Sequence, residues 1–414
     1  MALRLLYLPA YFTPEHAASS YLANNRNQAF ADAGFDVITY TATPCRGISS
    51  EVRAEYCKKE HLVEKMYNGH MTVHRFSMFA EGKKPIMRAL RYVFCWLKQF
   101  YYGLKTKDID CIYLASTPPI QGLLGAYLKK FKKVPFVYNI QDVFPDSLVG
   151  TGLTSKGSIL WKIGRLIENL TYKYADKIIV ISEDFKRNIM AKGVPEDKIV
   201  VVYNWADQNV VVNVERSENK LIKKYNIAPS KFYIEYIGNM GLTQNMDMLL
   251  DVMKDLKYSY PEIGLILVGE GAYKKRVEAI VRRNSLTNVI MLPFQPYEDI
   301  SHVFSLGDVG LVISKLGVGA NSFPSKTWSI MSASRPVLAN FDENEIKSIL
   351  SDNNCGIFTK AGDKDAFKAA IIKLYENRDL CKEYGRNGRE FIMKNLTREV
   401  GTQKYVDVIK SVVK

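Results

Sequence analysis

Short apolar segments alternate with helical segments along almost the whole chain, and this alternation limits the possible folds more than any other feature. The apolar segments are rich in Val, Ile and Tyr, and most are apolar on both faces; they are LRLLYLPA, FDVITYTA, CIYLAS, FVYNIQD, KIIVIS and IVVVYN in the first half, and FYIEYIG, GLILVGE, VIMLPF, VGLVIS and PVLANF in the second. Strands of this kind are typical of parallel sheets covered by helices on both sides. The sequence therefore predicts an α/β protein with doubly wound sheets.

A polar stretch, residues 207–224, divides the alternation into two halves. The chain has 414 residues, which is more than a single hydrophobic core usually accommodates. We therefore predict two Rossmann-like domains, residues 1–206 and 207–383, that face each other across a cleft. Residues 384–414 are expected to be helical and are a candidate to cross back to the first domain.

The charge of the chain indicates what it binds. Its formal net charge is +14, and 47% of its residues are hydrophobic. A globular protein with this excess of cations is expected to meet nucleic acid, acidic lipid headgroups or phosphorylated small molecules. The six cysteines are scattered without a CxxC pair, which suits a reduced cytoplasmic setting. No apolar run approaches the ~18 residues of a membrane span, so we expect a soluble or peripheral protein.

In open parallel sheets, ligands bind at the carboxyl ends of the strands. Two loops of the second half combine glycines with the start of a helix, and they contribute Gly238, Asn239, Gly241 and Gln244 after FYIEYIG, and Gly269, Gly271 and Lys274 after GLILVGE. Glycines let a backbone approach a ligand closely, and the free N–H groups of a helix start favour phosphate. The alternative for each loop is an ordinary tight turn between a strand and a helix.

Two further loops of the second half are candidates. Phe294 and Gln295 follow VIMLPF, and their backbone could read a nucleobase edge, although a plain connector is as good an interpretation. In NSFPSKTWS, Pro324 suits a first helical turn, next to Ser325 and Lys326. The helix dipole disfavours a lysine there unless an anion lies beside it. We therefore predict that Lys326 binds phosphate; a solvated lysine is the alternative.

Candidate acceptor contacts lie in the first half. Asp142 and Asp146 follow FVYNI, and Glu15 and His16 follow the first strand. The two aspartates could instead cap helices, and the histidine could be a plain loop residue. The DID triplet at 108–110 precedes a strand, at the opposite end from the expected cleft, and we predict no metal site.

Several motifs in order resemble the retaining nucleotide-sugar glycosyltransferases of the GT-B fold (group 1, family 4 type). They are YLPAYFTPEH, NIQDVFPDS, ADKIIVISE, VVYNWAD, YIGNMG, LVGEGAYKK, LPFQPYEDI and FPSKTWSIMSASRPVLA. The GNMG and PSK forms look most like the N-acetylfucosamine-type transferases of O-antigen and capsule assembly.

The resemblance implies transfer from a UDP-sugar, which is a substrate, with no separate cofactor and no metal. It implies that Lys326, the Gly241 N–H and the helix start at Ser325 stabilise the departing diphosphate, and that Asp142 holds a sugar hydroxyl or the acceptor. The chain also departs from the family pattern. Asn321 and Ser329 occupy the positions of two glutamates, and Asn239 and Gln244 those of an arginine and a lysine, which Lys326 and Lys274 would replace.

Residues 83–105 predict an amphipathic helix with basic residues on one side and bulky apolar residues on the other. Such helices are typical of membrane interfaces, although a helix packed on its own domain would show a similar pattern. We expect peripheral contact with an anionic membrane, at the inner face of the plasma membrane, where a polyprenyl-diphosphate-linked acceptor would be found.

Three rival functions remain at this stage. A non-hydrolysing nucleotide-sugar epimerase has the same layout but needs acid and base residues, of which the sequence shows no well-placed set. An inactive scaffold would fit the missing glutamates. A nucleic-acid-binding protein would fit the charge, but no recognition motif is present, so we expect no nucleic-acid partner.

Overall fold

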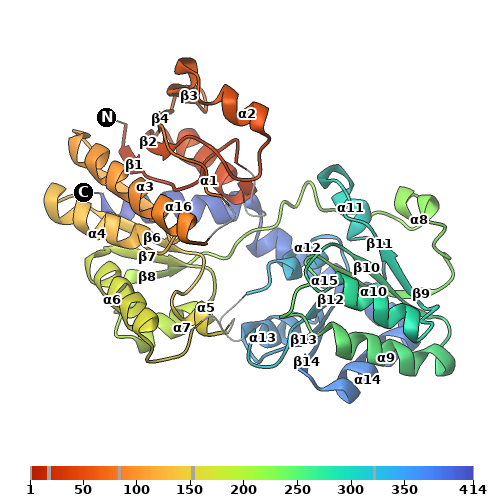
Figure 1. The fold of residues 1–414 in the computed structure, drawn as a ribbon. Helices are drawn as coiled ribbons and strands as arrows, with labels where there is room; N and C mark the ends of the chain where they lie inside the picture. The colour runs from red at the N-terminus through yellow and green to blue at the C-terminus, as the bar shows by residue number, and fades with distance from the viewer. Residues whose placement is uncertain (1, 16–19, 83–84, 151–153, 320–322, 414) are drawn as a thin grey trace. The chain divides into compact units, whose positions relative to one another are not determined.

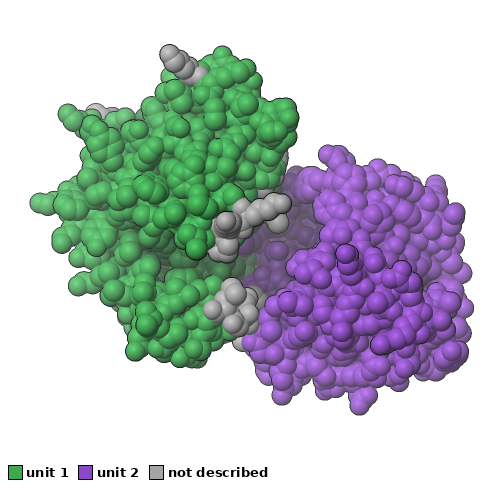
Figure 2. Space-filling view, in the orientation of Figure 1, with its two compact units in different colours: residues 1–203, 399–414 green, residues 204–398 purple. Residues whose placement is uncertain are grey.

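The computed structural model describes residues 2–15, 20–82, 85–150, 154–319 and 323–413. The chain divides into two compact units (Figure 2): unit 1 is Met1–Tyr203 with Glu399–Lys414, and unit 2 is Asn204–Arg398. The division therefore falls shortly before the expected boundary at 206/207. The segment 384–414 is split, because only its last part belongs to unit 1.

An eight-stranded sheet forms the centre of unit 1, in the order β3-β4-β2-β1-β5-β6-β7-β8. Its strands are β1 (Arg4–Tyr7), β2 (Asp36–Ala42), β3 (Val63–Met66), β4 (Met71–Phe76), β5 (Cys111–Ala115), β6 (Phe136–Ile140), β7 (Lys177–Val180) and β8 (Ile199–Val201). Neighbouring strands run parallel, except that β3 at the edge is antiparallel to β4. The strand order reverses between β1 and β5, which is where such sheets leave a crevice for ligands.

The helices of unit 1 cover both faces of this sheet. They are α1 (Ser20–Asp32), α2 (Ser50–Glu55), η1 (Lys59–His61), α3 (Pro85–Lys105), α4 (Gln121–Lys132), α5 (Asp146–Gly150), α6 (Ile159–Tyr174), α7 (Glu183–Ala191), η2 (Glu196–Lys198) and α16 (Arg398–Val412). Serine side chains cap the start of three of them, since Ser49 accepts the N–H of Val52, Ser158 that of Trp161 and Ser182 that of Phe185. Helix α4 packs on β5 and β6 with α3 on one side and α6 on the other (Figure 1).

Unit 2 contains a parallel six-stranded sheet in the order β11-β10-β9-β12-β13-β14. Its strands are β9 (Phe232–Ile237), β10 (Ile263–Val268), β11 (Val289–Leu292), β12 (Val309–Ile313), β13 (Val337–Phe341) and β14 (Gly356–Lys360). Its helices are α8 (Lys220–Lys224), α9 (Met246–Ser259), α10 (Lys274–Arg283), η3 (Tyr297–Asp299), α11 (Ile300–Val303), α12 (Lys326–Ser332), α13 (Glu345–Asp352), α14 (Lys364–Glu376) and α15 (Arg378–Asn395).

The strand order of unit 2 reverses between β9 and β12. These strands and β10 are buried; on one face of the sheet they pack against α9 and α14, and on the other face β9 and β10 pack against α8 and the segment around α11. A rigid core on this scale fixes the positions of the loops that leave its carboxyl edge. Those loops carry most of the candidate binding residues.

The predicted fold class is confirmed, and every segment predicted as a strand contains one. The sequence analysis missed β3, β4 and β14. The first two carry charged or histidine side chains, and β3 and β14 lie at sheet edges, where a strand does not need two apolar faces. Strand β3, which the sequence did not predict, is the strand that pairs antiparallel, with β4.

Candidate functional site

A cavity of about 300 Å³ lies at the carboxyl ends of β9 and β12, the point where the strand order of unit 2 reverses. It is lined by Thr243, Gln244, Val312, Ile313, Ser314, Val318, Gly319, Phe323, Pro324, Ser325, Lys326 and Phe341. A cavity of this size at a switch point is a typical ligand site of an open parallel sheet.

Lys326 is the first residue of α12 and lines this cavity. Its Nζ lies 3.8 Å from the centroid of the Tyr236 ring. A Cβ placed on Gly238 would lie 3.3 Å from the same nitrogen, so only glycine leaves the ammonium this much room. Among the described residues Lys326 has no acidic partner, and burial lowers its pKa to about 7. An anionic ligand would relieve this unfavourable burial of a cation.

The glycines after β9 and β10 are explained in the structure by the contact between their two loops. A Cβ on Gly269 would lie 2.0 Å from the carbonyl oxygen of Gly238, and one on Gly271 would lie 2.3 Å from that of Met240. The N–H of Met240 donates to the carbonyl of Glu270 at 2.7 Å, which joins the loops directly. For Gly269 and Gly271, the contact with a neighbouring loop is thus a sufficient reason for a glycine, without a phosphate.

Other residues of these loops already have protein partners. The Gly241 N–H donates to Oε1 of Gln244 at 3.0 Å, so a phosphate contact by this group would require the glutamine side chain to move. Lys274 begins α10 and pairs with Glu270 at 2.5 Å. Asn239 is exposed, and its carbonyl accepts the hydroxyl of Tyr236.

The remaining predicted residues of unit 2 differ in their surroundings. Phe294 is exposed, whereas Gln295 is buried and donates to the Tyr225 hydroxyl and the Pro293 carbonyl. Ser325 lines the cavity, while the half-buried Ser329 lies one turn further along α12, outside the cavity lining. Asn321 lies outside the described residues.

The sequence analysis missed Thr243, Ser314 and Phe341, which also line the cavity. The Ser314 hydroxyl is buried and finds no hydrogen-bond partner in the described part of the chain. A buried hydroxyl of this kind usually has a partner, and a polar ligand would supply one. Ser314 directly follows β12, so the rule that led to the other loops could have found it.

In unit 1, Glu15 fixes two loops together. Its Oε2 accepts the N–H of Phe12 at 3.0 Å, and its Oε1 accepts those of Cys45 and Arg46 at 2.9 and 3.0 Å. The carboxylate is buried. These three hydrogen bonds are a sufficient reason for an acidic residue at position 15. They leave its carboxylate few free lone pairs with which to bind the acceptor substrate. His16 lies outside the described residues.

Asp142 and Asp146 follow β6 but have different environments. Asp142 is exposed, and the removal of water from part of its carboxyl raises its pKa above the ordinary value. Asp146 begins α5 and accepts from Lys192 at 2.8 Å and from Asn188 at 3.1 Å. Burial, the largest single effect, acts against its charged form, but the bond and charge of Lys192, the Asn188 bond and the charge of Arg165 together outweigh it and lower the pKa. Asp142 is thus the better placed of the two for a ligand.

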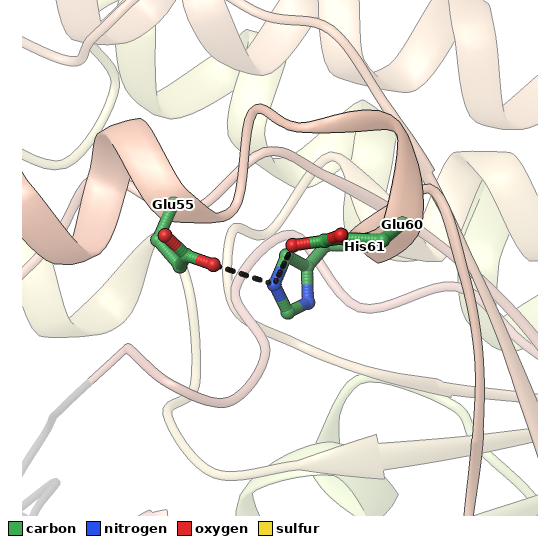
Figure 3. A group of neighbouring side chains, drawn as sticks. All are labelled: Glu55, Glu60 and His61. Atoms are coloured by element: carbon green, nitrogen blue, oxygen red, sulfur yellow. Dashed lines mark hydrogen bonds and ion pairs between the residues drawn. The ribbon is translucent and has the colours of Figure 1, made fainter.

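In the part of the chain that the structure describes, one group of side chains could reach a common metal ion: Glu55, Glu60 and His61, whose candidate ligand atoms lie within 4.8 Å of one another (Figure 3). These groups also have protein partners. Lys58 pairs with Glu55 at 2.5 Å, and Glu64 bonds to His61 at 3.0 Å. Local pairing therefore accounts for the group.

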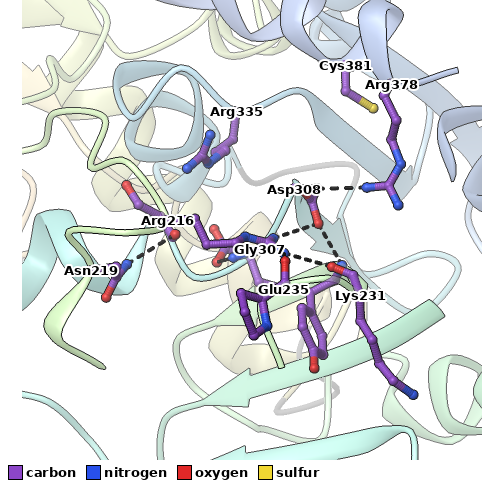
Figure 4. A network of polar contacts seen from close by, with 12 residues as sticks. Arg216, Asn219, Lys231, Glu235, Gly307, Asp308, Arg335, Arg378 and Cys381 are labelled. Atoms are coloured by element: carbon purple, nitrogen blue, oxygen red, sulfur yellow. Dashed lines mark hydrogen bonds and ion pairs between the residues drawn. The ribbon is translucent and has the colours of Figure 1, made fainter. Parts of the chain in front are cut away.

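Strand β9 also carries a buried acid, Glu235, within a polar network (Figure 4). Its Oε2 accepts the N–H of Gly307 at 2.6 Å, and burial raises its pKa to about 8. The neighbouring Asp308 accepts from Arg216 at 2.8 Å and from the N–H of Tyr233 at 2.7 Å. The network links β9 to the turn before β12, at the amino edge of the sheet, opposite the edge that carries the cavity.

Each half of the chain matches a known protein family. Residues 217–391 match the glycosyl transferases group 1, and residues 25–210 match glycosyltransferase family 4. The chain carries both of these glycosyltransferase domains. The group 1 domain lies within unit 2 and contains the cavity with Lys326.

Similar proteins carry related names. WbjE of Pseudomonas aeruginosa, a glycosyltransferase by name, is 24% identical over 304 residues, which are 73% of this chain and 74% of WbjE. WcaI of Escherichia coli strain K12, named for colanic acid biosynthesis, is 27% identical over 211 residues, 49% of this chain and 50% of its own. The structure of HepE from Anabaena in complex with UDP has a TM-score of 0.73 at 16% identity and covers 99% of this chain and 100% of HepE. This likeness confirms the GT-B fold.

Proposed function

We propose that this protein is a glycosyltransferase that moves a sugar from a UDP-sugar to a lipid-linked or saccharide acceptor, with retention, in the assembly of bacterial O-antigen or capsule. The proposed donor sugar is an N-acetylated deoxyhexosamine. The two glycosyltransferase domains support the reaction class, and the names of WbjE and WcaI favour a polysaccharide pathway. The UDP bound by HepE favours a uridine nucleotide.

The observation that carries the proposal is the lysine at the cavity of unit 2. When the bond between the anomeric carbon and the diphosphate breaks, negative charge develops on the diphosphate oxygens. A Lys326 ammonium without an acidic partner among the described residues would stabilise that charge, and no metal ion is needed for the step. Asp142 would hold a sugar hydroxyl or the acceptor.

The test is transfer activity of Lys326→Ala with UDP-sugar and acceptor. Loss of a charge-stabilising group typically lowers kcat by about 100- to 1,000-fold, and we expect at least that loss with an unchanged circular dichroism spectrum. Lys275→Ala is the matched control, because Lys275 is an exposed lysine one residue into α10 and should keep full activity. Normal turnover by Lys326→Ala would contradict the proposed site.

Incubation with the donor alone separates the rival functions. A transferase should leave the sugar unchanged or hydrolyse it slowly, whereas an epimerase would produce a new sugar nucleotide without any acceptor. The failure of every nucleotide sugar to bind or react would favour an inactive scaffold.

We also propose that α3 contacts an anionic membrane at the inner face of the plasma membrane, where a polyprenyl-diphosphate-linked acceptor would be found. The apolar side of α3 faces outward: Ile86 is 74% exposed, and Leu90, Val93, Phe94 and Leu97 are exposed as well. The opposite side packs on unit 1, where Arg91 is buried and donates to the carbonyls of Thr43 and Phe79. The basic residues predicted to lie together on one side of α3 therefore do not share one environment, because Arg91 is buried. Lys83 and Lys84 lie outside the described residues.

Among the described residues, no helix is both long and apolar enough to cross a bilayer.

A further inference from the structure

Helix α6 also exposes an apolar stripe. Ile159 is 79% exposed, Ile163 52% and Leu166 60%. These residues are four and three positions apart, so they lie on one side of the helix, with the exposed Leu160 beside them. Hydrophobic residues scattered singly on a surface are ordinary, but a continuous helical stripe indicates a binding face.

Helix α4 joins this stripe to α3. It packs against both helices, and the three lie side by side (Figure 1). Its exposed side chains include Tyr127 and Phe131. Rings of α3 and α4 contact one another between the helices: Phe100 lies 6.4 Å from Tyr127 and 6.0 Å from Phe131, measured between ring centroids. The three helices thus present one layer of exposed aliphatic and aromatic groups, the α3–α4–α6 face.

The helices of this face are basic. They contain ten basic residues: Arg88, Arg91, Lys98, Lys105, Lys129, Lys130, Lys132, Lys162, Arg165 and Lys173. Arg91 is buried on the side of α3 that packs on unit 1, and Arg88 and Lys129 pair with Glu81 and Asp176, so these three add little free charge to the face. The three helices contain one acidic residue, Glu168, which is buried and paired with Arg165 and Lys192. Lys130, Lys162 and Lys173 are exposed next to the apolar groups.

We propose that α6 is a second lipid-contacting helix, so that unit 1 binds an anionic bilayer through the whole α3–α4–α6 face. This inference rests on the membrane contact proposed above for α3 and extends it. Aliphatic stripes enter the headgroup region, while lysines beside them reach the anionic headgroups. Basic residues near such a surface strengthen the attraction to it.

The charge argues for a bilayer rather than a second copy of the chain. A symmetric pairing through this face would bring the same basic residues opposite each other, with no exposed acidic side chain on the described helices to compensate them. An anionic membrane supplies both an apolar phase and the opposite charge.

Sedimentation of the full chain with vesicles of phosphatidylcholine, with or without phosphatidylglycerol, tests the proposal. We expect binding that requires phosphatidylglycerol, and a double variant in α6, Ile163→Ser with Leu166→Ser, should weaken it at least tenfold, about 1.4 kcal/mol. The pair Val93→Ser with Leu97→Ser in α3 should weaken it similarly. Tyr258→Ser is the control, because Tyr258 is 82% exposed on α9 of unit 2 and should not matter.

The outcomes distinguish the lipid contact of α6 from the membrane contact of α3 on which it rests. Unchanged binding of the α6 variant, with loss of binding in the α3 variant, would overturn the role of α6 and leave the α3 contact standing. Absence of any vesicle binding by the wild type would overturn both, without bearing on the Lys326 assay. A dimer in light scattering that dissociates in the α6 variant would show a self-association face and overturn the inference. Because the substituted side chains are exposed, thermal unfolding should not change.

Discussion

Two lysines show why residue type alone could not define the site. Lys274 and Lys326 both begin a helix after a strand of unit 2, and both were predicted to bind phosphate. In the structure Lys274 pairs with Glu270, whereas Lys326 lies over the Tyr236 ring, with no acidic partner among the described residues. The difference lies in side-chain environment, which a loop motif does not specify.

Binding of UDP should change the protonation of Lys326. At pH 8 a lysine with a pKa of about 7 is mostly neutral, and a diphosphate beside it would raise that pKa. We expect uptake of about one proton per UDP bound by the wild type and almost none by Lys326→Met. Calorimetric titration in buffers of different ionisation enthalpy measures this uptake. Equal uptake by both proteins would exclude Lys326 as the group concerned.

Glu235 should make the stability of the protein depend on pH. Its folded pKa of about 8 lies above the ordinary value of 4.5, so the unfolded chain loses this proton first as pH rises. The stability that the protonated Glu235 gives to the folded state is therefore lost progressively between about pH 4.5 and 8. Glu235→Gln cannot ionise, and its stability relative to wild type should rise over that range, by a few kcal/mol in total. Urea unfolding at pH 5 and pH 8.5 measures the difference, and an equal gap at both values would contradict it.

At the scale of elements, the paired loops after β9 and β10 position the cavity. Each strand and each helix start could be predicted, because periodicity and glycine placement are local signals. The contact between the loops could not be predicted, because it joins residues about thirty positions apart through backbone atoms. That contact, rather than a phosphate, accounts for Gly269.

Substitution of Gly269 should damage the loop pair. Its φ of +147° is strained for other residues, and the added Cβ would meet the Gly238 carbonyl. We expect Gly269→Ala to cost about 3 kcal/mol in the free energy of unfolding, and to weaken UDP binding. Gly362→Ala is the control, because its φ is also positive but nothing lies within 4 Å, so it should cost about 1 kcal/mol. Equal losses in denaturant unfolding would show that backbone strain, not loop contact, dominates.

At the scale of the whole molecule, the chain completes unit 1 with its last helix. Tyr405 of α16 is buried; its hydroxyl donates to Asn139 at 3.3 Å, and its ring lies 5.9 Å from the Arg26 guanidinium and 6.3 Å from the Tyr113 ring. Unit 1 therefore depends on residues that follow all of unit 2 in the sequence.

Removal of the Tyr405 ring should destabilise unit 1 selectively. Truncation of a buried aromatic residue costs about 3–5 kcal/mol, so Tyr405→Ala should lower the thermal transition of unit 1 and leave that of unit 2 in place. Gln403→Ala, at an exposed position of the same helix, should change neither. A shift confined to unit 2 in calorimetry would contradict this assignment.

The sequence by itself determined the α/β class, the two sheets, most of their strands and the loops that could hold a nucleotide sugar, because apolar periodicity, glycines and proline act locally. The tertiary structure decided which residues of those loops have protein partners: Glu15, Lys274 and Gln295 do, while Lys326 and Ser314 line the cavity without a described polar partner. It also decided that the apolar sides of α3 and α6 face outward. The reason is physical: burial and pairing depend on atoms brought together from distant parts of the chain, which no local pattern records.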